Sequence, residues 1–218
     1  MKIECVDLTK SIRRNPILQH IQFTFESGKV YGLQGKNGSG KTMLIRAICG
    51  LITPTSGKVL YNDQELGKDL EFPPSVGLLL ERPSFLGEYS GLKNLQHLAS
   101  INRRITDEEI RQAIVSVGLD PDDKKKYRKY SLGMKQKLGI AAAVMEKPEL
   151  VILDEPTNAL DTAGIDLVRN IVTNLRNRNR LIIIASHDHD ELRALADEIL
   201  VLEAGSLKEV ITVAERSF

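Results

Sequence analysis

Short hydrophobic runs alternate with glycine-containing turns in the first third of the chain. The segments KIECVDL, IQFTFE and KVYGLQG have the length and the composition of β-strands, and Ser27-Gly28 separates the second run from the third. Because these strands are short and follow one another closely, we expect a small antiparallel sheet that leads into a core strand.

The hydrophobic pattern becomes helical between residues 83 and 147. Apolar and amide positions recur there with a period near 3.6, at Asn94, Leu95, Leu98 and Ile101. Thr106 and Glu109 form a capping box that opens the next helix, TDEEIRQAIVSVGL. Asp120 followed by Pro121 predicts the start of a further helix. We therefore expect a helical segment between two regions that contain strands.

Strands and helices alternate again after residue 148. LVILD and LIIIAS are uninterrupted apolar strands, which a parallel sheet covered on both faces requires. The other expected elements are helices at about 163–176 and 189–196, and a hairpin in EILVLEAGSLKEVI that turns at Ala204-Gly205. The pattern as a whole predicts an α/β core interrupted by a helical insertion.

Composition limits the classes of partner. The 218 residues are 42% hydrophobic, which is ample for a buried core, and 30 basic against 29 acidic residues leave a net charge of +1. Because the charges nearly cancel, the chain has no electrostatic field of a single sign, and we expect no nucleic-acid partner. No apolar run approaches the roughly 20 residues of a membrane span, and MKIECVDLTK lacks the apolar core of a signal peptide. The chain is therefore expected in the cytoplasm.

Two other features have ordinary interpretations. Cys5 and Cys49 lie among apolar neighbours without metal-type spacing, so we expect reduced, buried thiols. The run KKKYRK, residues 124–129, is interpreted as a solvated loop, because one short basic run in a near-neutral chain is usually surface charge.

A phosphate-binding loop follows the strand VYGLQ and precedes an apolar helix. The segment GKNGSGKT fills every fixed position of the pattern G-x-x-x-x-G-K-[ST]. Its members are Gly35, Lys36, Asn37, Gly38, Ser39, Gly40, Lys41 and Thr42. The glycines let successive N–H groups point at phosphate oxygens, Lys41 can reach the β- and γ-phosphates, and the Thr42 hydroxyl can ligate Mg²⁺. The loop predicts a nucleotide site that uses Mg²⁺, without saying what the nucleotide drives.

The segment LVILDEP supplies a second set of candidate groups. Four apolar residues place Asp154 at the carboxyl end of a buried strand, where a carboxylate can hold Mg²⁺ directly or through water. Glu155 is the adjacent candidate for polarising the attacking water. We expect both carboxylates to be functional because the phosphate loop lies upstream.

The segments GKNGSGKT, YSLGMKQ, LVILDEPTNALD and IIIASHD resemble, in order and spacing, those of an ATP-binding cassette (ABC) ATPase. The resemblance covers nearly the whole chain and implies a single ABC ATPase domain, 1–218. The implied fold is α/β, with a RecA-like P-loop NTPase core and an N-terminal antiparallel β subdomain in 1–82 and 148–218. It also implies an inserted helical subdomain in 83–147.

The resemblance also implies roles for four residues outside the phosphate loop. Asp161 in TNALD matches the family's D-loop, which faces a second subunit, and His187 matches the switch histidine that contacts the γ-phosphate. Ser131 and Gly133 match the signature, which closes over the ATP of the other subunit. Lys41, Glu155 and His187 are then the expected catalytic residues.

The sequence departs from the family pattern at several positions. Glu81 stands where the family has a glutamine; it can still offer an oxygen to Mg²⁺, so it joins Thr42 and Asp154 as a candidate metal ligand. Ile12 stands where many relatives place an adenine-stacking aromatic residue, which predicts weaker nucleotide binding. In the signature, Leu132 and Met134 replace the usual residues of LSGGQ.

The resemblance implies an ATP-hydrolysing subunit that powers transport through a membrane permease in a separate chain. ATP would drive dimerisation with a second ATP-binding subunit, as a homodimer, on the inner face of the cell membrane. Glu81 and YSLGMKQKLGIA resemble the branch of bacitracin, lantibiotic and drug exporters, so we expect export of a drug, peptide or other amphipathic compound. A non-transport ABC ATPase of translation or DNA repair is the alternative; a small-molecule kinase would not explain YSLGMKQ or TNALD.

Overall fold

The computed structural model describes residues 1–80 and 83–213, so the candidate metal ligand Glu81 lies outside the described residues. A four-stranded antiparallel sheet has the order β2-β1-β4-β5. Its strands are β1 (Lys2–Ile12), β2 (Asn15–Glu26), β4 (Ser56–Tyr61) and β5 (Gln64–Glu65). The small antiparallel sheet expected from the N-terminal pattern is therefore present.

A second sheet of six strands has the order β10-β9-β3-β8-β7-β6, and all its pairs are parallel except β9 with β10. Its strands are β3 (Val30–Gln34), β6 (Val76–Leu79), β7 (Leu150–Asp154), β8 (Leu181–Ser186), β9 (Glu198–Glu203) and β10 (Ser206–Thr212). Every residue of β7 and β8 is buried, as the uninterrupted apolar runs predict. The carboxyl ends of β3, β7 and β8 meet at one edge.

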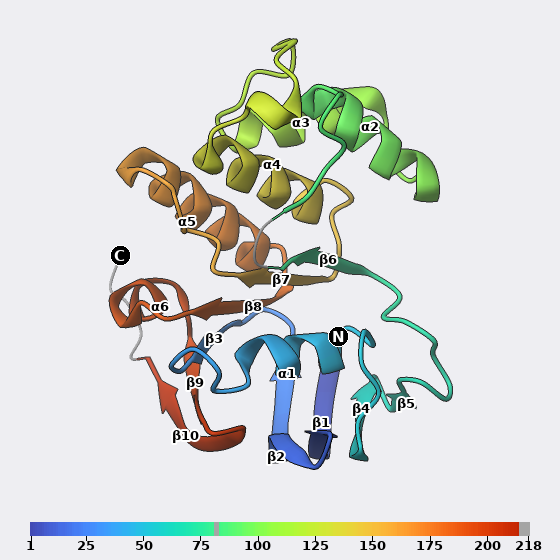
Figure 1. The fold of residues 1–218 in the computed structure, drawn as a ribbon, viewed down its shortest axis with the longest axis vertical. Helices are drawn as coiled ribbons and strands as arrows, with labels where there is room; N and C mark the ends of the chain where they lie inside the picture. The colour runs from blue at the N-terminus through green and yellow to red at the C-terminus, as the bar shows by residue number, and fades with distance from the viewer. Residues whose placement is uncertain (81–82, 214–218) are drawn as a thin grey trace.

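The helices separate into groups on the two sides of this sheet (Figure 1). They are α1 (Lys41–Ile48), α2 (Gly91–Asn102), α3 (Asp107–Ser116), α4 (Leu132–Val144), α5 (Thr162–Asn177) and α6 (His189–Leu195), with one 3₁₀ turn, η1 (Tyr127–Lys129). The helix α1 lies between the two sheets, whereas α2, α3 and α4 gather at one end of the molecule, beyond β6 and β7. The capping box of Thr106 and Glu109 is formed at the start of α3.

The prediction of a helix starting at Asp120-Pro121 is wrong. The backbone there forms turns, in which the N–H of Asp122 donates to the Asp120 side chain at 2.9 Å and the N–H of Lys125 donates to the Asp123 side chain at 2.8 Å. Short acidic side chains that bond nearby backbone groups compete with helix formation, and here they prevail.

The basic run 124–129 is also only partly a solvated loop. Its Lys and Arg side chains are exposed, but Tyr127 is buried, its hydroxyl donates to the Pro83 carbonyl at 2.5 Å, and its ring packs edge-on against Phe85. The aromatic ring therefore ties this loop to the segment that follows β6.

Alternate residues of the parallel sheet enter two hydrophobic cores. Val151 and Leu153 pack in the core with α4, α5 and α6, whereas Leu150 and Ile152 pack in the core with α1 and the antiparallel sheet. This alternation follows from the two-residue period of a strand. Cys5 and Cys49 are free and buried, as expected, and burial raises the pKa of each thiol to about 12. Within the described residues, no helix is both long and apolar enough to cross a membrane.

Candidate nucleotide site

The phosphate loop connects β3 to α1 through a backbone that only glycine fits at several points. Gly38 and Gly40 have φ values of 81° and 108°, in the left-handed region that other residues rarely adopt. A Cβ atom added to Gly35 would lie 2.5 Å from the carbonyl oxygen of Leu202. The loop thus curls tightly over the end of β3 and leaves its N–H groups near the N-terminus of α1, where anions are favoured.

Lys41 and Thr42 begin α1 and present two different groups to the loop. The Lys41 side chain is buried, and its ammonium donates to the Gly35 carbonyl at 2.6 Å, so the positive charge lies inside the curl. The Thr42 hydroxyl donates to Oδ2 of Asp154 at 3.0 Å. Asp154 is 2% exposed at the end of β7, as the sequence predicts for a strand-end carboxylate.

These residues fit ATP and Mg²⁺. A hydroxyl and a carboxylate that touch each other are the oxygen ligands that Mg²⁺ takes, usually with water and phosphate completing its coordination. Gly38 has no atom within 4 Å of the position that a Cβ would occupy, so the outer side of the loop is open. The buried hydroxyl of Ser39 has no hydrogen-bond partner among the described residues. The loop therefore offers space and unused polar groups where phosphates would bind.

Glu155 and His187 come from neighbouring strands and meet at the same edge. Glu155 follows β7, His187 follows β8, and Nδ1 of His187 lies 2.8 Å from Oε2 of Glu155. Glu155 has a φ of 51°, which a residue other than glycine adopts only under strain. The side chain of His187 is 62% exposed and that of Glu155 is 17% exposed. The pair is thus preformed and accessible from one side.

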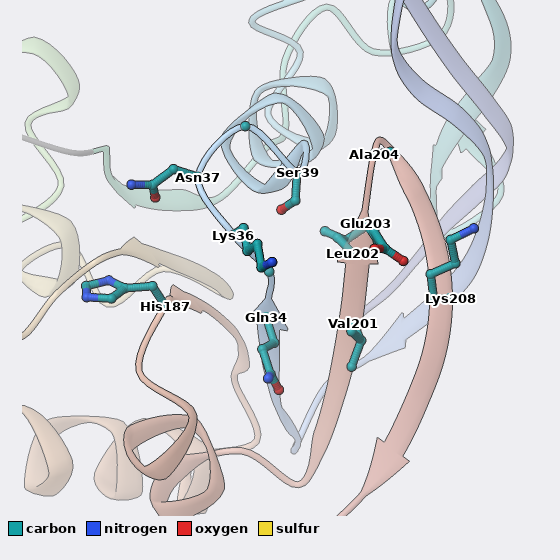
Figure 2. A pocket seen from close by; sticks show the side chains of 12 residues that line it. Gln34, Lys36, Asn37, Ser39, His187, Val201, Leu202, Glu203, Ala204 and Lys208 are labelled. Carbon is teal, nitrogen blue, oxygen red and sulfur yellow. The ribbon is translucent and has the colours of Figure 1, made fainter.

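Two cavities border the phosphate loop. The larger, of about 980 Å³, has Lys41, Thr42, Asp154 and Glu155 in its wall. The smaller, of about 570 Å³, is lined by residues 34–39 and by the β9–β10 hairpin, and His187 forms part of its wall. Figure 2 shows the loop between His187 and the β9–β10 hairpin. Both cavity volumes fall in the range of small-molecule sites, about 300–1,000 Å³. Lys41, Asp154 and Glu155 contribute charged groups to the larger cavity, whereas His187 lines the smaller one.

The signature residues lie at the start of α4, and one of them, Leu132, lines the larger cavity. Ser131 is the N-cap of α4, where its hydroxyl accepts from the Met134 N–H at 3.2 Å, and both Ser131 and Leu132 are exposed. A Cβ on Gly133 would lie 2.8 Å from the carbonyl oxygen of Ala159, so a glycine is required for α4 to approach that loop. Neither Ser131 nor Gly133 is among the described residues that line the two cavities. Within the described lining, the start of α4 therefore borders the larger cavity through Leu132, Lys135 and Gln136, but not through Ser131 or Gly133.

Asp161 and Ile12, two further predicted site residues, are also not among the described residues that line these cavities. Asp161 caps α5, and its side chain accepts from the Gly164 N–H at 2.9 Å. Ile12 ends β1 and is 45% exposed.

Sequence reasoning missed two buried polar residues beside the site. Gln136 donates from Nε2 to the carbonyl oxygens of Glu155 and Pro156, and Glu191 accepts from the Ser186 hydroxyl at 2.7 Å. Gln136 directly follows YSLGMK, but the sequence alone does not show which face of the helix it occupies.

The fold and the loop define a nucleotide-binding α/β protein of the P-loop class. The comparisons then give the family: the model for the ABC transporter family matches residues 18–158, which is more than half of the chain. The chain belongs to the ABC transporter family. It is an ATP-binding subunit, and its family's cassettes are ATPases that bind ATP with Mg²⁺, dimerise and work with a membrane permease.

Individual proteins agree with this assignment. An uncharacterized ABC transporter ATP-binding protein of Bacillus subtilis (strain 168) is 44% identical over 206 residues, 94% of each chain. A bacitracin transport ATP-binding protein of Enterococcus faecalis is 38% identical over 215 residues, 98% of this chain and 70% of that protein. An ATP-binding cassette, solved as a post-hydrolysis dimer with ADP and Pi, superposes with a TM-score of 0.88 over 99% of this chain and 100% of its own. Because the two sequences are only 18% identical, this structural similarity supports the fold alone.

Proposed function

We propose that the Glu155–His187 pair, next to the buried contact of Thr42 with Asp154, hydrolyses ATP held by the phosphate loop. Glu155 accepts a hydrogen bond from the attacking water and orients it, while His187 holds the carboxylate and faces the γ-phosphate. Lys41 neutralises phosphate charge. Thr42 and Asp154 hold Mg²⁺, which when bound neutralises charge on the phosphate oxygens. The 2.8 Å contact between Glu155 and His187 is the observation that carries this proposal.

The proposed active form is a homodimer in which each subunit completes the other's site. Ser131 is exposed at the N-terminus of α4, where a hydroxyl and backbone N–H groups favour an anion. Ser131 and Gly133 are not among the described residues that line the cavities beside their own phosphate loop, so in this proposal they contact the ATP of a second copy. Asp161, in the loop before α5, would lie at the same interface.

The proposed physiological role is to power export through a permease encoded by a separate chain. The resemblance to a bacitracin transport ATP-binding protein supports a drug, peptide or other amphipathic compound as the substrate class. In this proposal the chain is peripheral on the inner face of the membrane. Segment 83–147 acts as the helical subdomain, 1–82 and 148–218 form the core, and the region around Glu81 couples the site to the permease.

The test is the Glu155→Gln variant with ATP and Mg²⁺, with Glu209→Gln, at an exposed position of β10, as the matched control. The amide keeps the shape of Glu155 but is a poor proton acceptor, so hydrolysis should fall by about 10²-fold or more. ATP should then persist and hold a dimer that analytical ultracentrifugation detects. If Glu155→Gln hydrolyses ATP like the parent, the assignment of Glu155 is wrong. If it remains monomeric at high protein concentration with ATP bound, the shared-site proposal is wrong.

A further inference from the structure

Gln136 is a buried polar residue that the proposed chemistry does not use. It lies in the N-terminal part of α4 with 6% of its surface exposed. Its Nε2 atom donates to the carbonyl oxygen of Glu155 at 2.9 Å and to that of Pro156 at 3.1 Å. A buried amide group that makes two bonds to neighbouring main-chain carbonyls holds that part of the backbone in place. Losing the donor would remove the bond to the Pro156 carbonyl and leave the Glu155 carbonyl with its 3.3 Å bond from the Asn158 N–H.

The main chain at that point has an unfavourable conformation. Glu155 has a φ of 51° and precedes Pro156, whose ring restricts the preceding residue to extended backbone. Such a conformation persists only when neighbouring groups hold it. The Glu155 N–H donates to the Ala185 carbonyl at 2.8 Å, and the Asn158 N–H donates to the Glu155 carbonyl at 3.3 Å. Gln136 adds the only side-chain hydrogen bond to this peptide among the described residues.

The same end of α4 also contacts the loop that follows Pro156. Gly133 lies so close to Ala159 that a Cβ atom would be 2.8 Å from the Ala159 carbonyl oxygen. Ala159 itself has a φ of 64°. The start of α4 and residues 155–159 therefore form one packed unit, with Gln136 at the end nearest the Glu155 carboxylate.

We infer that Gln136 is a positioning residue for hydrolysis: it holds the strained Glu155 peptide so that the carboxylate points at the attacking water. This inference rests on the proposed function of Glu155. Because Ser131 caps the helix α4 that contains Gln136, Gln136 also links the signature, which we propose covers the partner's ATP, to the Glu155 of its own chain. Gln136 lines the larger cavity, but its amide donor bonds to the main chain at Glu155 and Pro156, so its effect should appear in the rate of hydrolysis and not in ATP affinity.

The first experiment uses Gln136→Met, which keeps the length of the side chain but removes the donor. The control is Gln112→Met, an exposed glutamine of α3 whose amide bonds only to the Glu108 side chain in the described structure. We expect kcat for ATP to fall at least ten-fold in Gln136→Met, with the Kd for ATP, measured by calorimetry with Mg²⁺, within two-fold of the parent. Gln112→Met should change neither quantity. An unchanged kcat, or loss of ATP binding together with activity, would overturn the inference.

The second experiment combines Gln136→Met with Glu155→Gln in single-turnover hydrolysis. If Gln136 acts through Glu155, the double variant should hydrolyse ATP no more slowly than Glu155→Gln alone, because the group being positioned is already absent. A further ten-fold loss in the double variant would show that Gln136 acts elsewhere. The Glu155→Gln result alone judges the proposed function, so the two ideas can fail separately.

Discussion

Nδ1 of His187 lies 2.8 Å from Oε2 of Glu155, although 32 residues separate them in the sequence. The contact follows from sheet order, because β7 and β8 are parallel neighbours in which Asp154 pairs with Ala185. The residues that follow the two strands must then emerge side by side at the carboxyl edge. Glu155 and His187 are those residues, so the topology itself creates the pair.

Substituting His187→Ala should lower kcat by about 10²-fold, the lower end of the range for a positioned acid–base group. The imidazole holds the Glu155 carboxylate, so without it the carboxylate is free to rotate. The KM for ATP should change little, because the phosphate loop remains intact. His189→Ala, two residues further on, is the control, and steady-state ATPase assays of both variants check the expectation. Equal losses in the two variants would contradict it.

Substituting Thr42→Val should reduce hydrolysis supported by Mg²⁺ by at least about ten-fold, a loss of roughly 1.4 kcal/mol. Valine keeps the β-branched shape but removes the hydroxyl that donates to Asp154. ATP binding measured with EDTA should be unchanged, since Lys41 and the loop backbone remain. The control is Thr173→Val on the exposed face of α5. An unaltered dependence of activity on Mg²⁺ concentration would exclude Thr42 as a ligand.

Substituting Ile12→Tyr should strengthen ATP binding. Ile12 is exposed at the end of β1, and an aromatic ring there could stack on adenine, an interaction worth about 1–3 kcal/mol per base in nucleic-acid complexes. We expect a Kd for ATP at least about five-fold lower, with a smaller effect on the Kd for inorganic triphosphate. Val210→Tyr, at an exposed position of β10, is the control. If Ile12→Tyr binds ATP no more tightly than the parent, the base does not lie against residue 12.

Glu191 should make stability decline as pH rises. Burial raises the pKa of its carboxyl above the ordinary 4.5, although hydrogen bonds from Ser186 and Thr157 act in the opposite direction. The folded chain therefore holds this proton more tightly than the unfolded chain, so the contribution to stability is complete below pH 4.5 and is lost as pH rises through the folded pKa.

Urea unfolding of the parent and of Glu191→Gln at several pH values from 4 to 8 tests this expectation. The free energy of unfolding of the parent, relative to that of the variant, should fall as the pH increases, because only the parent must bury a charge. Glu209→Gln, at an exposed site, should show no such trend. A difference between parent and Glu191→Gln that is independent of pH would contradict the prediction.

Local chemistry explains which features were predictable. The strands LVILD and LIIIAS, the capping box of Thr106 and the phosphate loop all appear where the sequence predicts them, since each depends on neighbouring residues. The helix expected at Asp120-Pro121 is absent because side-chain turns compete with the helix at that point. Tyr127 was misjudged for a different reason: its burial depends on Phe85 and Pro83, some 40 residues away.

The sequence by itself determined the phosphate loop, the buried strands and the strand-end carboxylates, because glycine conformations and hydrophobic periods act over a few residues. Only the tertiary structure decided that His187 meets Glu155, that Gln136 faces the Glu155 peptide, and that Ser131 is exposed at the start of α4. Those relationships depend on strand order and on the rotation of α4 about its axis. Both are fixed by the packing of the two cores, to which residues from the whole chain contribute.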